Sequence, residues 1–420
     1  MRCTILAVGS RGDVQPLLAL GIGLQAAGVT VRVATHKDFE AIVGGHGLEY
    51  FPMVGHASGF YGGAAGNAFR ERVRRAADFR RFFDNYLSLF LQRFLRDAWT
   101  ACQDADVVLS WSPSATSLAE RLKIPVFVAA PHPVLHLPTA AFPNPFHGAS
   151  RGWLGPLSNR LSWERAKPVI RIGGAQVNAW RETLGLGATS WRQDLGRLRR
   201  LPHLLGYSPT VLPKPWDWAR WIHVTGYWFL DGPRAFEPPP GLEAFLAAGP
   251  PPIAIGFSSQ VGPDAAALSR TVVESVTRAG VRAVLITGFG GIRGVEFPPH
   301  VFPVRTVPYD WLFTRVSAMV HQGGAGSTAA ALRFDLPNVA VPFGFDQSLW
   351  GARVHALGAG PAPVPAEKLT AGALAAAMRR LTTDARMRDR AATVGAKIRA
   401  EDGIGAAVSA ILAAVDGNEE

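Results

Sequence analysis

Hydrophobic residues gather in short runs along this chain, and the runs have the length of buried strands. The first run, Cys3–Val8, leads into a glycine-rich turn and then a helical pattern over Gln15–Ala27, with Pro16 near its start and Gly28 after its end. Proline and glycine are typical of these two helix positions. Val29–Thr35 then alternates as a second strand. Strand, helix and strand within about 35 residues predict a βαβ unit and hence a parallel sheet.

The same rhythm restarts after a proline-rich segment. Residues 231–252 contain seven of the 32 prolines, around a short helix at Leu242–Ala248. We expect further strands at Val107–Ser110, Val126–Ala130, Ile253–Phe257, Arg282–Thr287, Val301–Val304, Ala318–His321 and Asn338–Pro342. We expect helices at Asp264–Ala279, Gly324–Phe334, Gln347–Leu357 and, as a tail, Glu367–Val415. The pattern predicts an α/β protein with two doubly wound domains facing each other across a cleft.

Length and composition agree with this division. A chain of 420 residues exceeds what one core usually holds. We therefore expect a first domain over residues 1–230 and a linker over 231–252. A second domain over 253–400 follows, and a final helix over 401–420 packs back toward the first. With 48% hydrophobic and 18% charged residues, the chain has the composition of a folded enzyme.

Charge and cysteine content restrict partners and compartment. The net charge of +11 indicates nucleic acid, a membrane surface or anionic small molecules as partners. No nucleic-acid-binding motif is visible, so nucleic acid is the weakest of these. Cys3 lies in a predicted strand and Cys102 is the only other cysteine, so no disulfide framework is expected. Without a signal-peptide core or a run of roughly 18 apolar residues, we expect a cytoplasmic protein; peripheral membrane contact remains an alternative.

The segment His321–Thr328 concentrates candidate chemistry. It reads His-Gln-Gly-Gly-Ala-Gly-Ser-Thr between a predicted strand and helix. Its glycines let the backbone approach a ligand closely, and a helix N-terminus offers unpaired N–H groups and partial positive charge. Ser327 and Thr328 add hydroxyl donors. The segment predicts a pyrophosphate site, with a plain helix-capping turn as the alternative. Its spacing excludes a dinucleotide fingerprint, and a Walker loop would need a lysine.

Several segments together carry a family resemblance. His321–Thr328, Val341–Gln347 and Trp350–Val354 closely resemble the donor-binding region of bacterial antibiotic glycosyltransferases, of the glycopeptide and macrolide type, and of sterol glucosyltransferases. Further matching segments are Gly9–Pro16, Leu118–Pro125, Ala141–Phe146 and Val307–Phe313. The resemblance spans most of the chain. It implies the GT-B fold of two facing Rossmann-like domains, and a reaction without a metal ion.

The resemblance also implies donor-side roles. The sugar hydroxyls would be bound by Asp346 and Gln347, and the base by the Val307 backbone and Trp311, for which core packing is an equal alternative. His321 would contact the α-phosphate. The phosphate-binding set would be Ser259, His321, Gly323, Gly324, Gly326, Ser327 and Thr328. The family usually has a glycine before the serine that matches Ser259, whereas this chain has Ser258, which leaves that loop's geometry open.

Asp13 is the candidate catalytic base. It follows the glycine-rich turn at the mouth of the first predicted sheet, and sugar transfer to a hydroxyl needs a group that takes the proton. An aspartate with a pKa of about 3.9 is a weak base, so burial would have to raise this pKa. Capping of the following helix is the alternative role. Direct displacement assisted by Asp13 would invert the anomeric centre.

The acceptor side is less determined. Candidate contacts are Ser10, Phe83, His132 and Phe142. Residues 70–96 hold eight arginines, three acids and aromatics at helical spacing. They form either a core-facing helix with a solvated basic face, or a surface for the acceptor or an anionic membrane. A flat apolar acceptor, such as a polyketide, a sterol or another lipid, fits an aromatic-rich pocket.

Taken together, these observations predict a hexosyltransferase that moves a sugar, glucose in preference to a deoxysugar, from a UDP- or TDP-sugar to a hydroxyl of a hydrophobic small molecule. The nucleotide sugar is a co-substrate, and no cofactor is expected. A nucleotide-sugar epimerase of the same fold, a catalytically silent partner protein and a sugar-binding module are the rivals. Retention of His321, Asp346, Gln347 and Asp13 favours catalysis.

Overall fold

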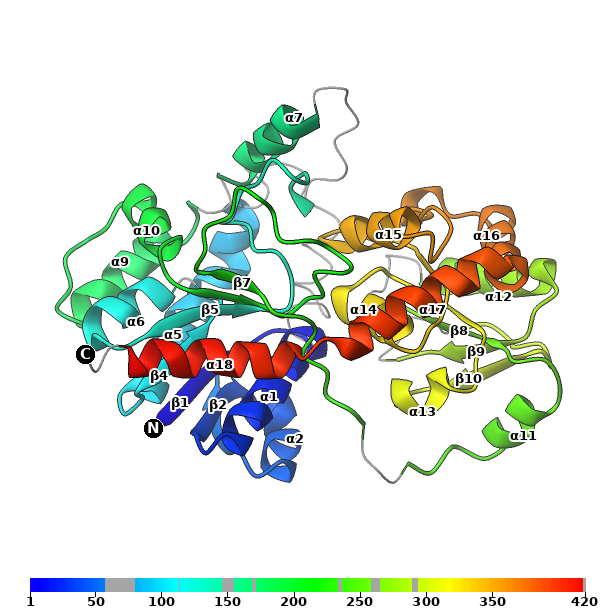
Figure 1. The fold of residues 1–420 in the computed structure, drawn as a ribbon, viewed down its shortest axis with the longest axis horizontal. Helices are drawn as coiled ribbons and strands as arrows, with labels where there is room; N and C mark the ends of the chain where they lie inside the picture. Colours follow the sequence, from blue (N-terminus) through cyan, green and yellow to red (C-terminus); the bar gives the residue numbers. More distant parts are fainter. Residues whose placement is uncertain are drawn as a thin grey trace.

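Two parallel sheets organise the chain, each covered by helices (Figure 1). The computed structural model describes residues 1–56, 80–112, 114–145, 155–167, 171–232, 236–257, 265–288 and 294–417. Strand pairing is parallel in both sheets. The predicted α/β architecture of two facing halves is confirmed.

The first sheet has seven strands in the order β3-β2-β1-β4-β5-β6-β7. They are β1 (Arg2–Ala7), β2 (Thr30–His36), β3 (Glu49–Met53), β4 (Val107–Ser110), β5 (Val126–Ala130), β6 (His203–Leu205) and β7 (Ile222–Val224). The strand order reverses between β1 and β4, and open parallel sheets bind ligands beyond the carboxyl ends of their strands at such a point. β6 and β7, of three residues each, were not predicted, since so short a strand shows little alternation.

Helices flank this sheet on both faces, and one further helix, α7, projects away from it (Figure 1). The helices of this half are α1 (Arg11–Ala26), α2 (Glu40–Gly45), α5 (Ser88–Cys102), α6 (Ala115–Leu122), α7 (Gly155–Ser162), α9 (Gly174–Thr183) and α10 (Trp191–Leu198). α1 begins at Arg11 and not at Gln15 as expected, because Ser10 and Asp13 form a capping box that starts the helix one turn earlier.

The second sheet has five strands in the order β10-β9-β8-β11-β12. They are β8 (Ile253–Gly256), β9 (Ala283–Ile286), β10 (Val301–Val304), β11 (Ala318–His321) and β12 (Asn338–Ala340). The strand order reverses between β8 and β11, so this half has its own switch point. Its helices are α11 (Leu242–Ala247), α12 (Ala265–Ala279), α13 (Tyr309–Phe313), α14 (Ala325–Arg333), α15 (Gln347–Ala356), α16 (Ala371–Thr383) and α17 (Ala385–Ala400).

The last helix, α18 (Gly403–Asp416), leaves the second half and lies beside α1 of the first (Figure 1). Its Ala407 and Ile411 are fully buried in the cluster that covers the first sheet. Where the chain crosses over, a Cβ on Gly403 would lie 2.6 Å from the carbonyl carbon of Gly226, so the two backbones touch. The Trp228 indole also donates to the Gly403 carbonyl at 3.2 Å. The predicted domain limits themselves stay a prediction.

None of the helices in the described part of the chain has the length and hydropathy of a membrane span. In the described part of the arginine-rich segment, Phe82, Phe83 and Phe94 are buried, and Arg80 pairs with Asp84 at 2.8 Å. This part therefore turns three phenylalanines to the core and its charges outward, while Tyr86 and Leu89 are exposed as well. Residues 70–79 lie outside the described residues.

Candidate active site

The turn between β11 and α14 leaves an open helix N-terminus. Gly324 is the N-cap residue of α14 and provides no side-chain cap. Gly323 has φ +87°, and a Cβ there would lie 2.7 Å from the Gln347 carbonyl oxygen, so only glycine fits. Gly326 is exposed, and a Cβ there would meet nothing within 4 Å. Uncapped N–H groups that face open space can bind an anion.

His321 is fully buried beneath this turn, and both of its ring nitrogens already have partners. Nδ1 accepts from the Gly323 N–H at 3.0 Å, so Nε2–H donates to Asn338 Oδ1 at 2.9 Å. Burial lowers the pKa of His321 to about 4, which keeps the ring neutral. The expected free ring N–H for a phosphate oxygen is therefore not present in this arrangement. His321 holds the Gly323 turn in place, and its direct contact with phosphate stays a prediction.

The hydroxyls of α14 differ in their surroundings. Thr328 is fully buried, and its Oγ1 has no hydrogen-bond partner among the described residues. Ser327 hydrogen-bonds the Tyr309 side chain. Burial raises the pKa of Tyr309, while Ser327 and the nearby charge of Arg11 oppose that rise. Arg11 belongs to α1, so the first helix of one half lies near α13 and α14 of the other.

Asp346 and Gln347 start α15, the helix that follows the next strand. The Trp350 indole donates to Asp346 Oδ2 at 2.6 Å, and Trp350 is fully buried. Gln347 Oε1 accepts from the Phe343 N–H at 2.7 Å, and the residue is 5% exposed. Trp350 therefore orients the Asp346 carboxylate, whereas Gln347 mainly closes its own loop. Sugar binding by either residue stays a prediction.

Asp13 lies in the first turn of α1 at the carboxyl end of β1. Its Oδ2 accepts from the Ser10 N–H at 2.7 Å and from the Ser10 hydroxyl at 2.8 Å. Burial raises the pKa of Asp13 and the charge of Asp346 adds to this rise, whereas His132 and the Ser10 bonds oppose it. Asp13 thus does take part in helix capping. Its pKa is also raised, as a base requires, and charges from both halves of the protein influence that pKa.

His36 fixes the turn before Asp13, a feature that the sequence did not indicate. His36 is fully buried at the end of β2, and its Nε2 accepts from the Gly9 N–H at 3.1 Å. Gly9 has φ +129°, and a Cβ there would lie 2.6 Å from Asp13 Oδ2. The glycine and the histidine together allow Asp13 to fold back onto Ser10.

The candidate acceptor residues lie in different surroundings. His132 follows β5, where its Nδ1 lies 3.1 Å from the Pro133 carbonyl oxygen, and it is near enough to Asp13 to affect its pKa. Phe83 is buried, and its ring lies 3.3 Å from where a Gly173 Cβ would be. Phe142 is buried between Trp163 and Trp218. Both phenylalanines pack in the core, so acceptor contact by them stays a prediction.

The base-binding candidates also have protein partners. The Arg315 guanidinium lies 4.3 Å from the centre of the Trp311 ring. The Phe236 ring packs edge-on, 5.2 Å away. Val307 is half-buried in the same cluster. Packing thus occupies much of Trp311, and the role of both residues in base binding stays a prediction. Ser259, together with Ser258, lies outside the described residues.

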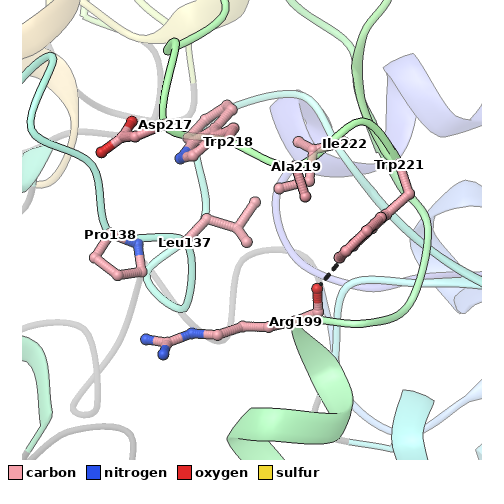
Figure 2. Close-up of a pocket in the computed structure, with 8 residues that line it drawn as sticks. All are labelled: Leu137, Pro138, Arg199, Asp217, Trp218, Ala219, Trp221 and Ile222. Atoms are coloured by element: carbon pink, nitrogen blue, oxygen red, sulfur yellow. Dashed lines mark hydrogen bonds between the residues drawn. The ribbon is translucent and has the colours of Figure 1, made fainter.

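Figure 2 shows a pocket of about 230 Å³ elsewhere in the first half. None of its lining residues is among those considered above for donor or acceptor binding. They are Leu137, Pro138, Arg199, Asp217, Trp218, Ala219, Trp221 and Ile222. His136, which precedes the lining residue Leu137, is buried and meets the buried His203, with their Nε2 atoms 2.8 Å apart.

Comparison with protein families matches both halves. Residues 3–136 match the glycosyltransferase family 28 N-terminal domain. Residues 291–412 match the C-terminal domain of erythromycin biosynthesis protein CIII-like proteins. A sterol 3-beta-glucosyltransferase of Cryptococcus neoformans var. neoformans serotype D is 37% identical over 98% of this chain and 27% of the relative. One of Aspergillus clavatus is 38% identical over 98% of this chain and 29% of the relative. The chain thus spans less than a third of the length of these relatives.

Solved structures share the fold. The glycotransferase of kitacinnamycin aligns with a TM-score of 0.70 at 21% identity, over 99% of both chains. The calicheamicin glycosyltransferase CalG4 aligns with a TM-score of 0.67 at 18% identity, over 99% of this chain and 98% of that one. With both halves matched by glycosyltransferase-type domain models and the full length aligned, this chain belongs to the GT-B-fold glycosyltransferases.

Proposed function

We propose that this protein transfers a hexose from a nucleotide diphosphate sugar to a hydroxyl of a hydrophobic small molecule. The observation that carries the proposal is the pairing of two features at facing sheet edges. One is the uncapped N-terminus of α14, and the other is Asp13, whose pKa is raised by burial. Such a transfer needs an anion site for the leaving diphosphate and a base for the acceptor hydroxyl.

The reaction is a direct displacement at the anomeric carbon. Asp13 takes the proton of the acceptor hydroxyl as its oxygen attacks, and the bond to the diphosphate breaks on the opposite face, so the configuration inverts. The α14 N–H groups and the positive end of its dipole stabilise the leaving diphosphate. Because these groups supply the positive charge, we propose that turnover persists in the presence of a chelator.

Glucose is the proposed sugar, and a UDP- or TDP-sugar is the proposed donor. The Asp346 carboxylate, oriented by Trp350, would accept hydrogen bonds from sugar hydroxyls that a deoxysugar lacks. The matched relatives are named sterol 3-beta-glucosyltransferases, and one aligned structure is a complex with thymidine diphosphate. A sterol, a polyketide or another lipid is the proposed acceptor class.

Asp13→Asn tests this proposal. The amide keeps the size and an oxygen acceptor for Ser10 but cannot take a proton, so turnover should fall at least about a hundredfold. Donor binding, measured as a rise in melting temperature with UDP-glucose and with TDP-glucose, should stay. Turnover at the wild-type rate in Asp13→Asn would disprove the base. Stabilisation by neither nucleotide sugar would argue for a catalytically silent protein.

A further inference from the structure

Trp216 is the most exposed large apolar side chain of the described residues, at 80%. It stands in the loop between β6 and β7, and the nearby Trp221 is 40% exposed. A fully hydrated indole forgoes the burial of a large apolar area. An exposed tryptophan beside charged groups is typical of side chains that settle at a lipid–water interface.

The loop that carries Trp216 is firmly held. The Asp217 carboxylate accepts from the Thr139 hydroxyl at 2.6 Å and from the Ala140 N–H at 2.8 Å. On the other side of Asp217, Trp218 is buried, and its backbone N–H donates to the Pro215 carbonyl at 3.2 Å. Because the residues around it are fixed, the outward direction of Trp216 is part of the fold.

A second apolar pair stands on a neighbouring element. α7 projects from the first half (Figure 1), and its Leu157 and Leu161 are 57% and 56% exposed. Four residues apart, they lie on one face of the helix. α7 runs into Trp163, whose ring packs on Phe142, and Phe142 packs in turn on Trp218. This aromatic cluster joins α7 to the Trp216 loop.

The charges on these two elements are mainly positive. Arg160, Lys214 and Arg220 are exposed, and no salt bridge of theirs is found among the described residues. The acids nearby have other partners, since Asp217 accepts from the Thr139 hydroxyl and Glu164 pairs with Lys167. Exposed apolar side chains among unpaired cations match the chemistry of an anionic bilayer surface.

We propose that Leu157, Arg160, Leu161, Lys214, Trp216 and Arg220, the Trp216 surface, dock this protein on an anionic lipid bilayer. The tryptophan and the leucines enter the interface, and the three cations lie against lipid phosphates and carboxylates. The Trp216 surface differs from the arginine-rich segment for which membrane contact was considered from the sequence. It does not depend on the transfer reaction, because docking needs neither donor nor acceptor.

Co-sedimentation of the full chain with vesicles tests the proposal. Wild-type protein should bind phosphatidylcholine vesicles that contain phosphatidylserine and leave them at high salt, and should bind pure phosphatidylcholine weakly. Trp216→Ala should weaken binding at least about tenfold, and the Lys214→Glu, Arg220→Glu double variant should remove the preference for the anionic lipid. Since Trp216 is 80% exposed, the melting temperature of the Trp216→Ala variant should equal that of the wild type.

Two matched controls sharpen the result. Leu89 is an exposed apolar residue on α5, at 58%, and Arg379 is an exposed cation on α16. Leu89→Ala and Arg379→Glu should each bind as wild type. Equal binding of wild type to both kinds of vesicle, or unchanged binding of Trp216→Ala, would overturn the proposal. So would a dimer in lipid-free sedimentation that Trp216→Ala dissociates, because the surface would then serve a second copy.

Discussion

Two glycines at equivalent positions in two different helices make the proposed anion site at α14 testable. Gly326 is the second residue of α14 and Gly372 is the second residue of α16. An alanine precedes each of them, both are exposed, and a Cβ would meet nothing within 4 Å at either position. Replacing glycine by alanine in a helix stabilises by about 0.5–1 kcal/mol, because it restricts the unfolded chain. Gly326→Ala and Gly372→Ala should therefore raise the free energy of unfolding by similar amounts.

Nucleotide binding should separate the two variants. Helical Cα–Cβ bonds tilt toward the N-terminus, so a methyl group at Gly326 leans into the space before α14 where we place the diphosphate. Displacing a phosphate from one charge-assisted hydrogen bond costs about 1.5–3 kcal/mol, which is roughly a 10- to 100-fold loss of affinity. Gly372→Ala has no such neighbour and should bind UDP as wild type.

Urea unfolding and isothermal titration calorimetry with UDP and TDP measure the two quantities separately. Whichever nucleotide binds to the wild type serves for the comparison. Tight binding by Gly326→Ala, equal to that of Gly372→Ala, would refute the diphosphate position. A loss of stability in Gly326→Ala would instead show that the glycine is structural, and binding data from that variant would then carry no information about the site.

Three further predictions concern other parts of the structure. His36→Gln, which can still accept from the Gly9 N–H, should keep most of kcat, whereas His36→Phe should lower it at least about tenfold through the Asp13 turn; steady-state kinetics with equal activity of the two variants would contradict this. Burial holds the pKa of His203 at about 4 and that of His136 well below its ordinary value. The unfolded chain then binds more protons below a pH of about 6.5, and the free energy of unfolding should fall from there down to pH 4; in urea titrations His203→Gln should flatten that slope. Gly403→Ala places a methyl group against the Gly226 backbone and should lower the melting temperature by several degrees; an unchanged value would mean that α18 shifts freely.

Local patterns along the chain were enough to predict most strands and the glycine turn that precedes α14. Val107–Ser110, Val126–Ala130, Val301–Val304 and Ala318–His321 have the predicted limits, because a buried parallel strand is a short apolar run bounded by turn residues. The glycines of His321–Thr328 likewise predicted a turn and a helix start, because the backbone conformation of such a turn depends on the residues within it. Such features depend on neighbours in sequence, so the sequence alone determined them.

The tertiary structure decided the hydrogen bonds, the pKa values and the packing of individual side chains and helices. That His321 has no free ring N–H depends on Asn338, 17 residues away, and that the pKa of Asp13 is raised depends on burial and on Asp346. The helix α18 reads as apolar on its own, but only the fold places it on α1. Hydrogen bonds, desolvation and charge act through space between distant segments, and periodicity along the chain contains no record of those distances.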